Sequence, residues 1–322
     1  MTVMKFGGTS VGDARRMAAV CEIIRSRLDK RPVVVVSALA GVTDLLVRAV
    51  AAVGVGDREA LEPILSDLER RHRWALAGTV DDPRSRHDLS LDVDALFEDL
   101  KQLLRSVRVL GEGTPRSTDA ILAFGETLSA RILVGALRDR GVTARWLDPR
   151  DVMITDGRHG AAAPDMVAVE KRCRERIFPV LEAGEVPVIG GFVGASVDGV
   201  TTTLGRGGSD TTASVLGSAM AAREIQIWTD VDGLMSADPK LVPTARTLEQ
   251  VTFAEAAELA FYGARVLHPA SIAPAVERQI PVRVLNSFRP EGQGTRILIS
   301  VPLAEGYQEP LQEEDENGTS RA

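Results

Sequence analysis

Residues 32–37 read PVVVVS and give the clearest indication of the fold in this sequence. Four consecutive β-branched residues between a proline and a serine are typical of a strand that is buried on both faces, as the central strands of parallel sheets are. A second run, VPVIGGFV at 186–193, has the same character. Together the two runs predict a mainly parallel sheet at the centre of the protein.

Short apolar runs alternate with longer amphipathic stretches on either side of these two strands. We expect strands at 3–6, 32–37, 145–147, 186–193, 224–229 and 281–285, and helices at 13–28, 42–53, 119–140, 166–182 and 210–222. This repeated alternation predicts an α/β fold. Residues 57–110 interrupt it with charged stretches and leucines at helical spacing, which predict two helices packed as a hairpin and joined by a loop at 81–90.

The composition is that of an ordinary globular protein. The chain has 322 residues, of which 44% are hydrophobic and 26% charged, with a formal net charge of −7. The length allows one large domain or two smaller ones, and the composition excludes a wholly disordered chain. Six acidic residues and one arginine fall in 304–322. We expect this tail to be disordered and the nearly neutral remainder not to bind nucleic acid.

The cysteines, the histidines and the hydropathy of the chain argue against several kinds of protein. We interpret Cys21 and Cys173 as reduced packing thiols, and the four scattered histidines show no metal-ligand spacing. No apolar run approaches the ~20 residues of a membrane span. The chain enters its first expected strand at once, so we expect no signal peptide. We therefore expect a cytoplasmic protein without a membrane segment.

The first expected strand ends in the motif KFGGTS at 5–10. Open α/β sheets bind ligands beyond the carboxyl ends of their strands. Gly7 and Gly8 allow the backbone to approach an anion closely, and Lys5 adds a positive charge. The motif lacks the spacing of a Walker A loop. The alternative is a tight turn beside a surface lysine.

The next expected strand is followed by SALAGVTD at 37–44. Small residues leave room for a ligand there, and the Ser37 and Thr43 hydroxyls can donate to a carboxylate or phosphate. The alternative is a plain helix start in which Thr43 is the N-cap.

The densest polar cluster is TTTLGRGGSD at 201–210. Arg206 offers a two-pronged donor for a carboxylate, and the glycines offer N–H groups. Asp210 either caps the following helix or helps to place Mg²⁺ or a charged substrate group. So polar and glycine-rich a segment between a strand and a helix indicates a site rather than a plain loop.

A fourth segment, WTDVDG at 228–233, ends another expected strand. With Lys240 it suggests a niche for a nucleotide, although Asp232 and Gly233 are equally typical of a simple turn. Arg265 is a further candidate cation, whereas we interpret His268 as a packing or capping residue. Taken alone, Glu126 in FGE at 124–126 reads as an exposed helical acid.

Together these segments closely resemble the catalytic domain of aspartate kinases, in the amino-acid kinase superfamily. The resemblance spans residues 1 to about 300 and rests on eight motifs in the family's order. They are KFGGTSV at 5–11, VVVSALAGVTDLL at 34–46, FGE at 124–126, VIGGFVG at 188–194, TTTLGRGGSDTTA at 201–213, TDVDG at 229–233, DPK at 238–240 and GARVLHPA at 263–270.

The resemblance implies a three-layer fold in which residues 1–300 form one kinase domain, 57–110 a helical insertion and 224–300 the nucleotide-binding part. It implies transfer of the γ-phosphoryl group of ATP to the side-chain carboxylate of L-aspartate, giving 4-phospho-L-aspartate. Mg²⁺ would be held mainly by the ATP phosphates, without dedicated protein ligands. A carboxylate nucleophile is already ionised at neutral pH and needs no general base.

The resemblance also assigns roles to individual residues. The catalytic residues would be Lys5, Arg206 and Asp210. Aspartate would be bound by Ser37, Thr43, Glu126, Arg206, Gly207, Gly208 and Ser209. ATP would be bound by Lys5, Phe6, Gly7, Gly8, Thr229, Asp230, Met235, Lys240, Arg265 and Val266. Glu126 would pair with the substrate ammonium, and Arg206 would grip the α-carboxylate.

The sequence departs from the family pattern in three ways. Met235 stands where many relatives have a tyrosine, and Lys240 and Arg265 exchange the usual arginine and lysine. The third departure is length, because the chain ends where relatives continue into ACT regulatory domains. We therefore expect activity without feedback control by lysine, threonine or methionine, and a possible homodimer through the N-terminal lobe. A same-fold kinase of another acidic substrate and a non-catalytic binding subunit stay open as alternatives.

Overall fold

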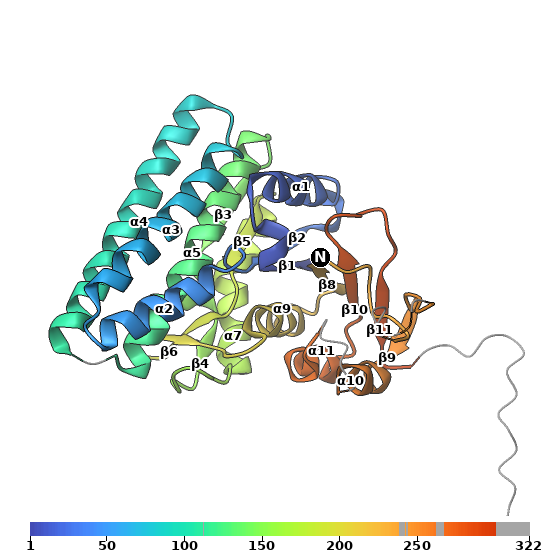
Figure 1. Cartoon of the computed structure of the whole chain (residues 1–322). Helices are drawn as coiled ribbons and strands as arrows, with labels where there is room; N and C mark the ends of the chain where they lie inside the picture. The colour runs from blue at the N-terminus through green and yellow to red at the C-terminus, as the bar shows by residue number, and fades with distance from the viewer. Residues whose placement is uncertain (112, 238–241, 243, 262–266, 301–322) are drawn as a thin grey trace, which may run out of the picture.

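An eight-stranded sheet forms the centre of the protein, with helices on both faces (Figure 1). The structure is a computed structural model that describes residues 1–111, 113–237, 242, 244–261 and 267–300. The strand order is β3-β5-β2-β1-β8-β10-β11-β9, and every described neighbouring pair is parallel except β10 and β11. The strands are β1 (Thr2–Phe6), β2 (Pro32–Val36), β3 (Ala144–Leu147), β5 (Val186–Gly190), β8 (Glu224–Thr229), β9 (Gln250–Thr252), β10 (Val282–Asn286) and β11 (Thr295–Leu298). The predicted α/β fold with a mainly parallel sheet is confirmed.

The valine run of β2 is buried on both faces, as its sequence predicts. Val33 and Val35 point into the core beneath α9 (Gly208–Ala219), and Val34 and Val36 point into the core beneath α5 (Pro115–Asp139). β1 follows the same alternation, with Val3 on the α9 side and Met4 on the other. Because side chains alternate along a strand, Lys5 shares the α9 side with Val3.

Two helical layers enclose this sheet (Figure 1). One layer contains α1 (Ala14–Arg25), α2 (Val42–Gly54), α3 (Arg58–Ala77), α4 (Pro83–Leu110) and α5 (Pro115–Asp139). The other contains α6 (Pro149–Val152), α7 (Met166–Arg172), α8 (Phe178–Glu182), α9 (Gly208–Ala219), α10 (Phe253–Phe261) and α11 (Ala273–Glu277). A second sheet of β4 (Ile154–Thr155), β6 (Val193–Ser196) and β7 (Thr201–Thr203) lies beside the N-terminal part of α5.

The loop expected at 81–90 is wrong. α4 already begins at Pro83, after the Asp82 side chain accepts a hydrogen bond from the Ser85 N–H. A proline in the first turn starts a helix, because the N–H that it lacks has no partner there in any case. The connection between α3 and α4 is therefore much shorter than expected.

Two other predicted elements are interrupted. The helix at 166–182 contains a π turn at Cys173–Ile177, just before Pro179, which cannot donate to the preceding turn. The strand at 186–193 ends at Gly190, because Phe192 has a left-handed φ of 65° and turns the chain into β6. The short strands β4, β6, β7, β9 and β11 were not predicted, because each carries too few residues to show a period.

α5 is long and carries many apolar residues. It is long and apolar enough to cross a membrane by length and composition, but 72% of its apolar window is buried inside the protein. A helix in the core of a globular fold passes the same test, so this feature follows from packing between the sheet and α4.

Both cysteines are free and buried, as predicted. Cys21 and Cys173 belong to different cores on opposite faces of the sheet. Burial raises the pKa of each thiol to about 12, so both are packing groups. The acidic tail predicted at 304–322 lies outside the described residues.

His72 is a buried polar group in the core between α3 and α4. Its Nδ1–H donates to the Leu68 carbonyl at 2.7 Å, and its ring packs edge-on against Phe97. The opposite nitrogen, Nε2, has no hydrogen-bond partner among the described residues. Burial lowers the pKa of His72 to about 4, so the folded protein holds it neutral.

We predict that His72 makes stability depend on pH between about 6.5 and 4. In this window the unfolded chain binds a proton on His72 and the folded chain does not, so stability falls as pH falls. Between pH 7.5 and 5 the wild-type free energy of unfolding should drop by roughly 1–2 kcal/mol more than that of His72→Leu. Urea unfolding measures both. The exposed His87→Asn is the control, and equal pH slopes for wild type and His72→Leu would contradict the prediction.

Candidate active site

A pocket of about 630 Å³ lies beyond the carboxyl ends of β1 and β2. Residues that are far apart in the sequence meet there, because parallel strands end at one edge of the sheet. The sequence-predicted residues that line the pocket are Lys5, Gly8, Ser37, Thr43, Glu126, Arg206, Gly207, Gly208, Ser209 and Asp210. The structure thus brings together the first three polar segments of the sequence and the FGE glutamate.

Lys5 and Asp210 form an ion pair at the base of this pocket. The distance between Lys5 Nζ and Asp210 Oδ1 is 2.6 Å, and the two side chains are 11% and 15% exposed. The alternative of a surface lysine is therefore wrong. Asp210 lies inside the first turn of α9 and does not cap it, since the N-cap residue is Gly207.

The N-terminus of α9 faces the pocket and carries Arg206 immediately before it. Arg206 is exposed and, within the described ranges, forms no ion pair, so its guanidinium is available to an anion. Gly191 at the end of β5 lies directly against Ser209. A Cβ at Gly191 would come within 2.7 Å of the Ser209 Cβ, so only glycine fits this approach.

Thr43 lies in the first turn of α2, on the wall of the same pocket. The N-cap of α2 is Gly41, so the interpretation of Thr43 as a cap is wrong. Ser37 follows β2 directly, and its N–H donates to the Phe6 carbonyl at 3.0 Å. Both hydroxyl-bearing residues therefore reach the pocket from neighbouring turns.

Glu126 is buried in α5, only 4% exposed, which corrects the expectation of an exposed helical acid. Burial raises its pKa to about 8, although an Ala38 backbone hydrogen bond and the nearby Lys5 charge favour the ionised form. Its Oε2 has no hydrogen-bond partner in the described part of the chain. A buried acceptor of this kind suits a cationic ligand group.

Of the residues assigned to ATP, Lys5 and Gly8 line this pocket, and the others lie outside its lining or outside the described residues. Gly7 donates its N–H to the Trp228 carbonyl at 3.0 Å, so the KFGG turn adjoins the end of β8. Thr229 and Asp230 follow there, and the Thr229 hydroxyl donates to Asp230. Phe6 is fully buried against Trp228, which leaves only its backbone for a nucleotide.

Met235 forms an isolated antiparallel β-bridge with Thr247 beyond this turn. Lys240, Arg265 and Val266 lie outside the described residues.

Sequence reasoning missed Asp119, which also lines the pocket and is only 1% exposed. It accepts hydrogen bonds from the Thr203 hydroxyl, the Gly160 N–H and His159 Nδ1. Asp119 precedes Glu126 by seven residues, which is about two turns along one face of α5. A second acid at this spacing is the signal that could have revealed it.

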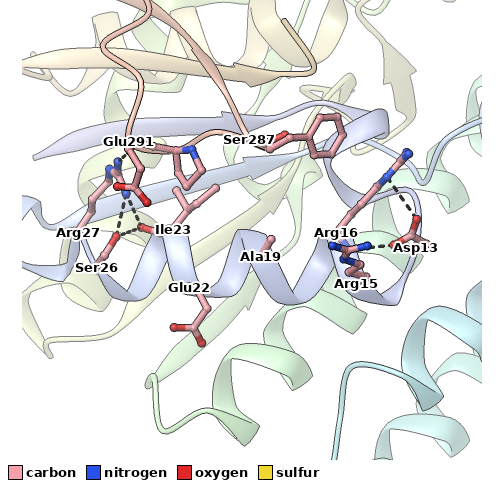
Figure 2. A pocket seen from close by; sticks show the side chains of 12 residues that line it. Asp13, Arg15, Arg16, Ala19, Glu22, Ile23, Ser26, Arg27, Ser287 and Glu291 are labelled. Atoms are coloured by element: carbon pink, nitrogen blue, oxygen red, sulfur yellow. Dashed lines mark hydrogen bonds and ion pairs between the residues drawn. The ribbon is translucent and has the colours of Figure 1, made fainter. Parts of the chain in front are cut away.

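A larger hollow of about 840 Å³ lies elsewhere, between α1 and the turn after β10 (Figure 2). Arg16 lies 5.1 Å from the Phe288 ring at one end, and Arg27 lies over Trp228 near the other. Acidic and basic side chains alternate along it, and none of the motif residues reaches it. The smaller pocket is therefore the candidate active site.

Comparison with known proteins agrees with this geometry. Residues 1–286 match the amino acid kinase family. The chain belongs to that family. Lysine-sensitive aspartokinase 3 of Escherichia coli is 39% identical over 303 residues, which cover 92% of this chain and 64% of that protein. Aspartokinase 3, chloroplastic, of Arabidopsis thaliana is also 39% identical over 303 residues, which cover 92% of this chain and 52% of that protein.

Solved structures place this amino acid kinase family member close to one branch of the family. The crystal structure of E. coli aspartokinase III in complex with aspartate and ADP has a TM-score of 0.85 and 36% identity, covering 94% of this chain and 65% of that one. An isopentenyl phosphate kinase shares the fold alone, with a TM-score of 0.52 and 18% identity. The chain spans about half to two thirds of the length of the curated aspartokinases named above.

We predict that Gly191→Ala destabilises this kinase fold by roughly 1–3 kcal/mol, because an added methyl group forces Ser209 and the α9 N-terminus away. Urea unfolding measures the change. The matched control is Gly54→Ala at the end of α2, where an added Cβ meets nothing within 4 Å. The prediction is wrong if the two alanine variants unfold at the same urea concentration.

Proposed function

We propose that this protein is an aspartate kinase that phosphorylates the side-chain carboxylate of L-aspartate with ATP. The observation that carries the proposal is one pocket that gathers two cations, Lys5 and Arg206, and one buried acid, Glu126. An amino-acid dicarboxylate presents the matching set of an ammonium and two carboxylates. The similarity to aspartokinases, one of them solved with aspartate and ADP, supports the same reading.

The substrate's amino-acid end would be held by Arg206 and Glu126. A guanidinium offers two parallel N–H donors to an α-carboxylate, which a lysine cannot reproduce. Glu126, with an unpartnered Oε2, would accept from the α-ammonium. Ser37, Thr43 and Ser209 line the same pocket and supply hydroxyl donors. This arrangement would leave the side-chain carboxylate to face the ATP.

Phosphoryl transfer would then depend on position and charge. The side-chain carboxylate attacks the γ-phosphorus in line, the bond to the β-phosphate oxygen breaks, and ADP leaves. Lys5 would neutralise charge on the transferred group, and the N–H groups at the start of α9 would help to hold it. Asp210 would orient Lys5 through their 2.6 Å ion pair. Thr229 and Asp230 would adjoin the nucleotide.

Mg²⁺ would reach the site on the ATP phosphates and reduce their charge there. Asp210 fits a supporting role, since its carboxylate lies in the pocket beside Lys5. A cytoplasmic location and a homodimer through the N-terminal lobe stay predictions from the sequence. Light scattering on the purified protein measures the homodimer directly.

The proposal is tested by ADP release from ATP and Mg²⁺ with a panel of acids. L-aspartate should give saturable turnover, whereas L-glutamate, D-aspartate and succinate should give far less. Succinate lacks the ammonium that Glu126 would bind, so it reports on that contact. Turnover with another acid in place of aspartate favours a same-fold kinase of different specificity. Binding of ATP without turnover on any acid favours a non-catalytic subunit.

We predict that Lys5→Ala lowers kcat on the order of a hundredfold or more and changes the KM for aspartate much less. The ammonium would act mainly on charge that develops in the transition state. Steady-state kinetics with Lys30→Ala, an exposed lysine, as control measure the effect. A near-normal kcat in a folded Lys5→Ala variant would remove Lys5 from this role.

We also predict that the KM for aspartate falls as pH rises toward 8. Burial raises the pKa of Glu126 to about 8, so at pH 7 most of the free protein carries a neutral carboxyl there. Only the ionised form pairs with the ammonium, so affinity should rise by up to about tenfold per pH unit below that value. The Glu126→Gln variant should bind aspartate weakly and lose this dependence. A wild-type KM that is flat from pH 6.5 to 8.5 contradicts the prediction.

A further inference from the structure

We infer that Asp119 and His159 are positioning residues for aspartate binding, which they support by fixing the loop that carries Arg206. The inference rests on the proposed function, because it names what holds the α-carboxylate contact in place. Neither residue belongs to the motifs that define the site in the sequence. Asp119 lines the pocket where α5, the 156–163 turn and β7 meet, and His159 contacts it from that turn.

Asp119 joins three segments through one buried carboxylate. The Thr203 hydroxyl donates to Oδ1 at 2.6 Å, and the Gly160 N–H donates to Oδ2 at 3.0 Å. His159 Nδ1 lies 2.8 Å from Oδ2 and must be the donor, because carboxylate oxygens accept. Three donors satisfy a buried carboxylate, which would otherwise cost several kcal/mol to desolvate.

The loop that carries Arg206 rests on the segments that Asp119 holds. Gly205 has a left-handed φ of 75° and lies against the turn at Gly160, where a Cβ would come within 2.9 Å of the Gly160 carbonyl oxygen. The Ala162 N–H donates to the Thr203 carbonyl at 2.9 Å, which ties the same turn to β7. Arg206 follows Gly205 directly, so the position of its backbone depends on this support.

Asp119 and Glu126 share one helix face but differ in what they leave unpaired. Glu126 keeps Oε2 without a partner, whereas both oxygens of Asp119 are occupied by protein donors. A carboxylate whose acceptors are used inside the protein has little left for a substrate ammonium. We therefore assign Glu126 to direct contact and Asp119 to support of the Arg206 loop.

The test removes the partners of Asp119, because removing Asp119 itself strips three donors of their acceptor and destabilises the fold. Thr203→Val deletes one donor and keeps the shape of the side chain. Thr202→Val is its matched control on the same strand, since Thr202 is equally buried and bonds Thr155 instead. His159→Ala deletes a second donor. His159→Asn keeps an N–H near the Nδ1 position and serves as the rescue variant.

We expect Thr203→Val to raise the KM for aspartate about five- to tenfold and His159→Ala at least threefold. The KM for ATP should stay within twofold in both, since none of the hydrogen-bond partners of Asp119 is among the residues assigned to ATP. Thr202→Val should leave both KM values within twofold, and His159→Asn should restore the KM for aspartate. A purely structural role would move melting temperature and both KM values together, which this split excludes.

Three outcomes overturn the inference. An unchanged KM for aspartate in folded Thr203→Val and His159→Ala removes the positioning role, while wild-type turnover still upholds the proposed function. An equal rise in the KM for aspartate in Thr202→Val would show that the effect comes from general packing of the strand. A wild-type protein that does not phosphorylate aspartate at all overturns the proposed function, and the inference falls with it.

Discussion

The ion pair between Lys5 and Asp210 joins the first strand of the sheet to the helix that begins some two hundred residues later. Each side chain lies almost buried in the pocket, where an unpaired charge is costly. The pair therefore requires that α9 begin directly over the end of β1. That placement points the N–H groups of α9 into the pocket and puts Arg206 at its rim. The pocket floor and the anion-facing helix end thus follow from a single contact.

Two acidic side chains reach the same pocket because the helix that carries them is buried against the sheet. α5 packs against the sheet through its apolar residues, and it carries Asp119 and Glu126 into the interior on the same face. The fold treats the two acids differently. Asp119 is saturated by protein donors, whereas Glu126 is left with an unpaired oxygen and a pKa raised to about 8. One acid therefore stabilises the structure, and the other has an unpaired oxygen that gives a cation a defined place to bind.

Close backbone approach sets the shape of the same pocket. Because Gly191 has no side chain, Ser209 can lie directly against its backbone. Gly205 allows the Gly160 carbonyl to approach in the same way. The first contact joins the end of β5 to α9, and the second joins the 156–163 turn to the loop of Arg206, so this loop is held from two sides. Preorganised donors of this kind bind an anion without reordering. Preorganisation therefore favours the binding of a charged substrate. The two helices α3 and α4 extend the apolar core on the far side of α5 and contribute no residue to this pocket.

The sequence by itself determined the parallel sheet, the ends of its central strands and most of the pocket residues. PVVVVS predicted a doubly buried strand because period-2 burial on both faces requires an unbroken apolar run. The polar motifs after those strands could be placed together because parallel strands end at one edge. Only the tertiary structure decided the burial of Glu126, the role of Asp119 and the break at Phe192. Those features depend on which segment packs against α5 and β5. The residues around one position do not indicate which segment, dozens of residues away, will contact it in the fold.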